Sequence, residues 1–217
     1  LMLMFFLMIV GIIYVEQGQR RIPIQFAKRV RGRKVMGGQS TYIPLKVNSA
    51  GVIPVIFATS ILFFPALVAT SLPQDNSVTA AIRNWIDVNL ANSQGTTWFY
   101  IFFLGILIIF FTYFYTTIQF DPVRQSDMIR RQGGFVPGVR PGISTTNYLS
   151  HIINRITLPG SIFLASVAVL PSIASAIWDI PLGFSGISIL ITVGVALETM
   201  KQIESQLSMR NYEGFID

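Results

Sequence analysis

Residues 42–65 read YIPLKVNSAGVIPVIFATSILFFP, and the chain carries no charge from residue 47 to residue 71. About 20 apolar residues cross a bilayer as a helix, so residues 47–71 are long enough to do so. The stretch is an unusual anchor because it contains Asn48 and Gly51 and has Pro54 in its first half. Proline kinks a helix, and in lipid the freed carbonyl needs a neighbouring helix or a wet cavity. We therefore expect this helix to face protein or water.

The composition indicates an integral membrane protein. The 217 residues are 52% hydrophobic and 12% charged, whereas soluble domains carry about 25% charged residues. The chain has no cysteine, which excludes disulfides, cysteine-ligated zinc, thiol nucleophiles and iron–sulfur clusters. His151 is the one histidine, so a site with several histidine ligands is excluded as well. We expect no metal site and no cofactor.

Five apolar segments predict an all-α polytopic membrane protein with five transmembrane helices. The segments cover residues 1–15, 47–71, 98–119, 156–177 and 185–207. The first would span only about 22 Å at 1.5 Å per residue, less than the roughly 30 Å hydrocarbon core. It also lacks the basic start and the cleavage site of a signal peptide. We expect it to be a truncated helix, so that the chain is the C-terminal part of a longer protein.

Successive loops are alternately rich and poor in lysine and arginine. They number eight in residues 16–46, one in 73–97, five in 121–155, none in 178–184 and two after residue 200. Basic residues accumulate on the cytosolic side of membrane proteins. We therefore expect the loops at 16–46 and 121–155 to be cytosolic, together with the C-terminus. The loops at 72–97 and 178–184 are expected to lie outside.

The first cytosolic loop is expected to form a β-hairpin-like projection with a basic tip. Ile22, Ile24 and Phe26 alternate with less apolar residues, and a return strand interrupted by glycines follows over residues 35–45. Most residues between the two strands are basic, namely Lys28, Arg29, Arg31, Arg33 and Lys34. Such a tip suits RNA phosphates or an acidic protein surface. An ordinary topology signal remains an alternative, although it needs only a few charges and no hairpin.

The second cytosolic loop is expected to be helical. Asp121 followed by proline predicts an N-cap for a short helix over residues 123–132, which should end at paired glycines. Arg140 then stands in a turn-rich segment between two prolines, and a further helix from about Thr145 should lead into the fourth span. In the outer loop, apolar residues at helical spacing around Trp85 predict a short helix on the membrane surface.

Five stretches together resemble the bacterial SecY family. They read EQGQRRIP at 16–23, QSTYIPLKVN at 39–48, AGVIPVIFA at 50–58, GFVPGVRPG at 134–142 and MRNYEGF at 209–215. Members of that family have ten transmembrane helices in two pseudo-symmetric halves. The resemblance implies that this chain corresponds to helices six to ten, beginning inside the sixth, and that the N-terminal half of the same protein is missing.

The resemblance implies the central pore-forming subunit of the Sec protein-conducting channel. Such a channel moves unfolded polypeptides across the bacterial inner (plasma) membrane and releases transmembrane segments to lipid through a lateral gate. The implied partners are SecE, SecG, the SecA motor, the ribosome, the nascent or signal-bearing polypeptide and membrane lipid. No catalytic residue is implied, so the chain is not expected to be an enzyme.

The same resemblance assigns roles to particular residues. Ile56 and Ile191 match members of a pore ring, which would block ions by dewetting yet deform around a polypeptide. Asn48, Gly51 and Pro54 match the lateral-gate helix. Docking of SecA and the ribosome is implied for Arg140, Lys28, Arg29, Arg31, Arg33 and Lys34. From the residues alone, an isoleucine in an apolar span more often faces lipid or the core.

Two other classes compete with a polypeptide channel. Half of a secondary transporter would also contain broken helices, but it should place ionisable residues in mid-membrane. Here the embedded Glu198 lies near a helix end and about one turn from Lys201, which favours a structural or topological role. An intramembrane enzyme would need a nucleophile with a base or a set of metal ligands. The cysteine-free chain with a single loop histidine offers neither.

Overall fold

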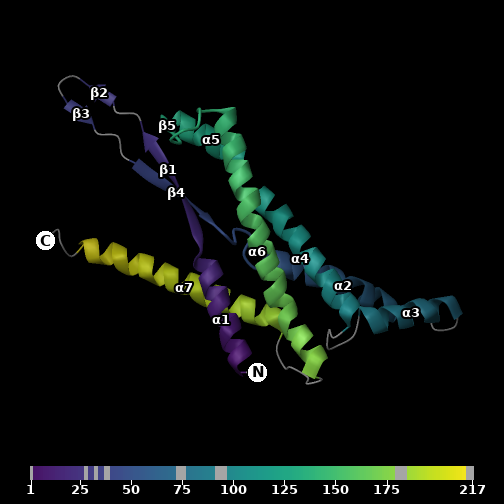
Figure 1. The fold of residues 1–217 in the computed structure, drawn as a ribbon. Coiled ribbons are helices and arrows are strands. Elements are labelled where there is room, and N and C mark those ends of the chain that lie inside the picture. Colours follow the sequence, from purple (N-terminus) through teal and green to yellow (C-terminus); the bar gives the residue numbers. More distant parts are fainter. Residues whose placement is uncertain are drawn as a thin grey trace.

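A computed structural model describes residues 2–26, 29–31, 34–36, 40–71, 77–90, 97–178 and 185–213, which are mainly helical (Figure 1). The helices are α1 (Met2–Gln17), α2 (Ile53–Ser71), α3 (Ser77–Asn89), α4 (Trp98–Gln119), α5 (Pro122–Arg131), α6 (Ile143–Trp178) and α7 (Gly186–Glu213). The strands are β1 (Gln19–Phe26), β2 (Arg29–Arg31), β3 (Lys34–Met36), β4 (Ser40–Lys46) and β5 (Gly134–Phe135). Among the described residues, four helical stretches are long and apolar enough to cross a membrane, and α1 is a shorter apolar helix. The predicted polytopic helical fold is confirmed.

The apolar core lies where α1, α2, α4, α6 and α7 meet. Ile12, Val55, Leu104 and Leu164 are each at most 2% exposed within it. The outward faces of these helices are also apolar, as with Phe102 of α4, which is 69% exposed. Apolar surface on both the inner and outer faces of a helix is typical of a bundle surrounded by lipid. Hydrophobic burial alone would not leave such side chains outward in water.

The structure corrects the interpretation of Pro54. We expected it to kink the helix from within, but α2 begins at Ile53 and Pro54 lies in its first turn. Proline is tolerated there because the first backbone N–H groups of a helix have no intrahelical acceptor. Pro65 is the proline inside α2. The break in the uncharged stretch therefore lies before the helix, in residues 47–52.

The fourth apolar segment is part of one long helix. The sequence predicted a helix from about Thr145 leading into the span at 156–177, and α6 runs unbroken over 36 residues. Pro159 and Pro171 both lie within it. Because α6 extends beyond the apolar core, it links that core to the loops at the hairpin end of the molecule (Figure 1).

The predicted hairpin is confirmed, and a third strand joins it. β1 pairs antiparallel with β4, with Ile22 opposite Ile43, and β2 pairs with β3 toward the tip. The expected glycine interruption of the return strand falls outside the described residues. β5 from the second loop adds to the other edge of β1, giving the order β4-β1-β5. A second apolar cluster forms beneath this sheet, comprising Ile22, Ile24, Leu45, Ile129, Val136, Leu149 and Ile152.

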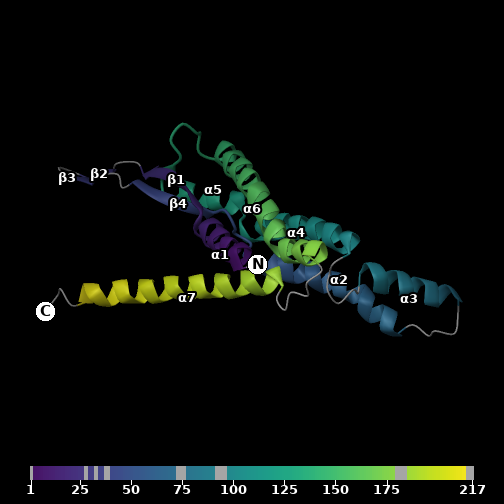
Figure 2. The same ribbon diagram turned by 60° about the horizontal axis from the view of Figure 1, so that its bottom comes forward.

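Both predicted short helices are present. α5 covers Pro122–Arg131, and its N-cap Asp121 accepts hydrogen bonds through Oδ1 from the backbone N–H groups of Val123 (2.9 Å) and Arg124 (3.3 Å). α3 lies at the opposite end of the molecule from the hairpin, as the views in Figures 1 and 2 agree. Its Trp85 packs edge-on against Phe99 of α4 with 5.6 Å between ring centroids.

Candidate functional site

The connection between β4 and α2, residues 47–52, is non-helical and is held against two other elements. The backbone N–H of Val47 donates to the carbonyl of Gly18 at the end of α1, at 2.9 Å. On the other side, a Cβ added to Gly160 of α6 would lie 2.7 Å from the Val47 carbonyl oxygen. Only glycine at position 160 permits so close an approach. The start of the connection is therefore fixed between α1 and α6.

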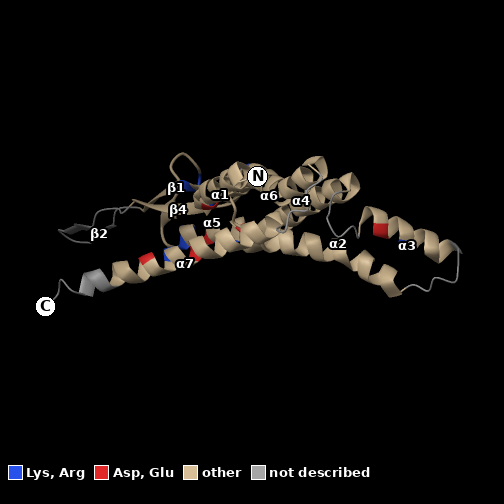
Figure 3. Cartoon of the chain, turned by 90° about the horizontal axis from the view of Figure 1, so that it is seen from below, with Lys and Arg blue, Asp and Glu red and all other residues tan. Residues whose placement is uncertain are grey.

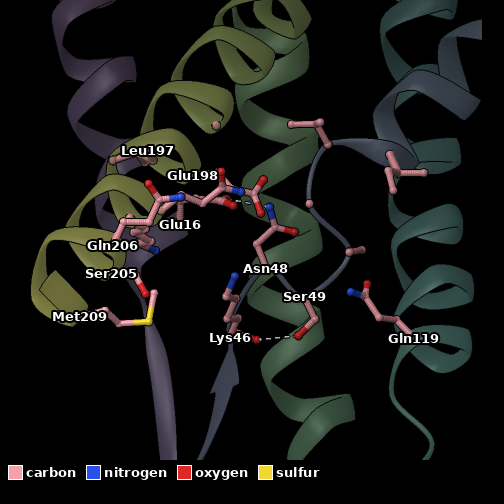
Figure 4. Close-up of a pocket in the computed structure, with 17 residues that line it drawn as sticks. Glu16, Lys46, Asn48, Ser49, Gln119, Leu197, Glu198, Ser205, Gln206 and Met209 are labelled. Atoms are coloured by element: carbon pink, nitrogen blue, oxygen red, sulfur yellow. Dashed lines mark hydrogen bonds between the residues drawn. The ribbon is translucent and has the colours of Figure 1, made fainter. Parts of the chain in front are cut away.

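Asn48 is the buried polar residue of this connection, with 5% of its surface exposed. Its Nδ2 donates a hydrogen bond to Oε2 of Glu16 at 2.9 Å. Figure 4 shows Asn48 pointing toward Glu16, while Gln119 lies on the other side of the connection. The Asn48 Oδ1 is buried and has no hydrogen-bond partner among the described residues. One half of this buried amide is thus bound to a carboxylate and the other half is unsatisfied.

Gly51 and Pro54 shape the entry into α2. Gly51 has φ of 64°, a left-handed conformation that glycine adopts without strain. The carbonyl of Val52 then accepts from the N–H groups of Val55 (3.1 Å) and Ile56 (3.3 Å), which closes the first helical turn. Pro54 needs no acceptor for this turn because it has no N–H. The three residues assigned to a gate therefore all lie where the connection enters α2.

Ile56 and Ile191 lie on different helices, α2 and α7. Ile56 is 43% exposed and Ile191 is half-buried. A Cβ added to Gly194 of α7 would lie 3.8 Å from Cγ1 of Val52. Ile56 follows Val52 by four residues and Ile191 precedes Gly194 by three, so each lies about one helical turn from this contact. The structure thus brings the neighbourhoods of the two isoleucines together.

A polar cavity of about 690 Å³ opens beside this connection (Figure 4). Its charged lining residues are Glu16, Lys46, Glu198 and Lys201. Sequence reasoning named Glu198 but assigned nothing to Glu16, whose hydrogen-bond partner is 32 residues away. The available signal was a carboxylate in the last turn of an apolar helix, where the helix dipole disfavours negative charge. No group of three or more histidine, aspartate or glutamate side chains within the described ranges could hold a metal ion.

The proposed docking residue Arg140 lies exposed on a tightly fixed turn. Its carbonyl accepts from Oγ1 of Thr145 at 3.0 Å, and the neighbouring Gly142 carbonyl accepts from Oγ of Ser126 at 3.1 Å. Of the basic tip, Arg29 and Arg31 belong to β2 and Lys34 to β3. Lys28 and Arg33 lie outside the described residues. The Arg140 turn is joined to the base of the hairpin, because β5 pairs with β1, whereas the tip strands β2 and β3 form a separate two-stranded sheet.

A model of the SecY family matches residues 1–200 of the chain. The protein translocase subunit SecY of Streptomyces scabiei is 52% identical over 215 residues, covering 96% of this chain and 47% of that protein. The Mycobacterium tuberculosis protein of the same name is 49% identical over 218 residues, covering 97% and 48%. The chain thus spans about half the length of the curated relatives it matches.

Two solved structures share the fold. One, of a SecY protein whose plug domain is described as stabilising the closed channel, has a TM-score of 0.55 at 15% identity and is covered over 51% of its chain. The other is described as a protein-conducting channel and has a TM-score of 0.53 at 14% identity, with 50% of its chain covered. Each alignment covers 98% of this chain.

Proposed function

The chain belongs to the SecY family, and on that premise we propose that it forms one half of the central pore of a protein-conducting channel. In the complete protein this channel moves unfolded polypeptides across the bacterial inner membrane and releases transmembrane segments through a lateral gate. The observation that carries the proposal is the start of α2, where a clamped non-helical connection feeds directly into an apolar helix. A plain membrane anchor gains nothing from such a junction.

We assign Ile56 and Ile191 to the pore seal. A hydrophobic constriction excludes ions because water leaves a narrow apolar passage, while flexible aliphatic side chains can still move aside for a polypeptide. The nearness of Val52 to Gly194, one turn from each isoleucine, supports this assignment. Asn48, Gly51 and Pro54 belong to the gate on this view, because they set where α2 begins and how freely that end can turn.

We assign docking to the hairpin end, which would face the cytosol. Arg140 and the basic tip residues would bind SecA and the ribosome, whose acidic or phosphate-rich surfaces attract lysine and arginine. The charge distribution supports this orientation. Residues coloured as charged lie on α7 and beside β1 in Figure 3, while α3 carries Arg83 and Asp87. The apolar spans 53–71 of α2, 98–119 of α4 and 156–177 of α6 contain no charged residue. SecE and SecG would contact the apolar outer faces within the membrane.

The transporter alternative is not favoured. Glu198 lines the polar cavity together with Lys201 toward the hairpin end, and it is not isolated in mid-membrane as a coupling-ion ligand would be. The relatives, moreover, are named translocase subunits.

The seal can be tested by replacing Ile56 with asparagine in the complete protein. A polar side chain holds water in the constriction, so we expect the resting ion leak of reconstituted vesicles to rise several-fold. Export of substrates with defective signal sequences should also rise. Ile61 is a matched control because it lies on the same helix and is 44% exposed, against 43% for Ile56.

The Ile61→Asn variant is expected to keep the leak and the selectivity of the unmodified channel. Equal effects of the two variants, or no effect of Ile56→Asn on either readout, would remove Ile56 from the pore.

A further inference from the structure

We propose that Glu16 is a positioning residue for signal-sequence selection, acting on the gate through Asn48. Its carboxylate ties the chain just before α2 to the end of α1, and so holds the gate helix in its resting place. The inference rests on the proposed channel function and adds to it a residue that none of the assigned gate, pore or docking positions includes.

The first observation is how the carboxylate is placed. Glu16 lies in the last turn of α1, where the unpaired carbonyls of a helix repel negative charge. Among the described residues, no lysine or arginine nitrogen lies within 4.0 Å of the Glu16 carboxylate. The ion pair found there joins Arg83 to Asp87 instead. The hydrogen-bond donor to Glu16 is Asn48 Nδ2 at 2.9 Å. Hydrogen bonds to a charged group are stronger than neutral ones, so this contact restrains both residues.

The second observation is the asymmetry of the connection between β4 and α2. At its beginning, Val47 is bonded to the Gly18 carbonyl and packs directly on Gly160. At its end, Gly51 has φ of 64° and open space around the position of a Cβ. We place the pivot of an α2 movement at Gly51, because glycine has the widest choice of backbone angles. Asn48 stands between the fixed end and the free end.

The third observation is the unsatisfied half of the amide. The Asn48 Oδ1 is buried without a partner among the described residues, and a buried acceptor left unpaired destabilises the arrangement that contains it. The Ser49 hydroxyl does not satisfy this acceptor, since it donates to the backbone carbonyl of Lys46 at the end of β4. The Glu16 carboxylate is thus the side-chain contact that keeps Asn48 in place. Losing that contact should favour any second arrangement in which the amide is better paired.

The test uses the complete channel in reconstituted vesicles with Glu16→Ala, Asn48→Ala and the double variant. The readout is export of a substrate with a defective signal sequence, divided by export of the same substrate with an intact signal. We expect each single variant to raise this ratio on the order of tenfold, the size of a typical coupling between two conformational states. The double variant should raise it no further, because both changes remove one interaction.

An exchange of donor and acceptor separates positioning from a general loss of structure. Asn48→Asp alone places two carboxylates together and should raise the ratio at least as much as Asn48→Ala. Adding Glu16→Gln restores a hydrogen bond with its direction reversed, so this pair should return toward the unmodified ratio. Glu204→Ala is the matched control, because that exposed glutamate of α7 does not line the cavity.

Three results would overturn the proposal. They are additive effects of Glu16→Ala and Asn48→Ala, equal losses for intact and defective signals, and no recovery in the exchanged pair. The Ile56→Asn variant, measured in the same assay, shows whether a negative result concerns only the Glu16 role or the channel assignment as well. If Ile56→Asn loosens selection while the Glu16 variants do not, Glu16 has no positioning role and the channel assignment stands. If none of the variants changes selection, the channel assignment fails as well.

Discussion

Gly51 is the residue on which the conformation before α2 depends most directly. Its φ of 64° is strained for any residue with a side chain, although the space around it is open. Replacing it with alanine should therefore cost about 1 to 2 kcal/mol through backbone strain alone. We expect Gly51→Ala to lower the Tm of the purified complete protein and to shift its gate equilibrium, the first measured by thermal unfolding and the second by ion conductance.

Gly105 provides the control for this prediction. It lies inside α4, where an added Cβ would meet nothing within 4 Å and the backbone is not left-handed. Alanine in such a helical position is more favourable than glycine by roughly 0.5 to 1 kcal/mol. Gly105→Ala should leave the Tm unchanged or raise it. A Gly51→Ala protein as stable and as tightly closed as the Gly105→Ala protein would show that the turn at residue 51 is not required.

At the scale of single residues, the sequence predicted some members of the candidate site and missed others. Asn48 and Gly51 were detectable because a polar residue and a glycine are conspicuous in an uncharged stretch. The role of Glu16 depends on a partner 32 residues away, and a single sequence contains no signal for such a pairing. Pro54 was misplaced because proline is equally compatible with a kink and with a first turn. Only the observed start of α2 distinguishes these two.

Among the elements, β5 has the clearest consequence for function. It joins the turn that presents Arg140 to the hairpin that ends in the basic tip. Gly134 permits the pairing, since a Cβ there would lie 3.0 Å from side-chain atoms of both Ile24 and Phe26. The two loops proposed for docking are therefore joined at the base of the hairpin and are not two independent projections. The small second cluster beneath the sheet supports this junction.

Replacing Gly134 with valine should separate the two loops. The added side chain cannot fit among three packed neighbours, so β5 should leave β1 and its amide protection in hydrogen exchange should fall. We expect SecA-driven export to fall in this variant. We expect the same fall in Arg140→Glu, which reverses the charge and should leave β5 paired. Both variants should still insert into the membrane. Unchanged SecA-driven export in either reconstituted variant would argue against docking through the Arg140 turn.

Sequence patterns predicted most of these elements, for identifiable reasons. The hairpin was visible from period-two alternation and α5 from its Asp121 cap, and both are local signals. β5 has only two residues, too few for any periodic pattern. Its formation depends on β1 offering an edge and on Gly134 offering no side chain. The pairing of two loops more than 100 residues apart is a tertiary property.

Across the whole molecule, apolar, basic and polar regions lie at different positions along the long helices. Apolar faces occupy the middle of the bundle, the basic hairpin and the polar cavity lie toward one end, and α3 lies toward the other (Figures 1 and 2). Charge counting along the loops predicted this order. It could not predict that α7 contacts the connection before α2 at Gly194 and Val52, because this is a tertiary contact between residues far apart in the chain. The pore assignment rests on this contact.

The central claim is that a translocating polypeptide passes Ile56. Photocrosslinking from position 56 of the complete protein to a stalled translocating chain tests it most directly. Position 191 is the second probe, and position 102 is the outward-facing comparison because Phe102 is 69% exposed on α4. We predict strong crosslinks from positions 56 and 191 and only background from position 102. Crosslinks of equal strength from positions 56 and 102, or none from position 56, would contradict the account.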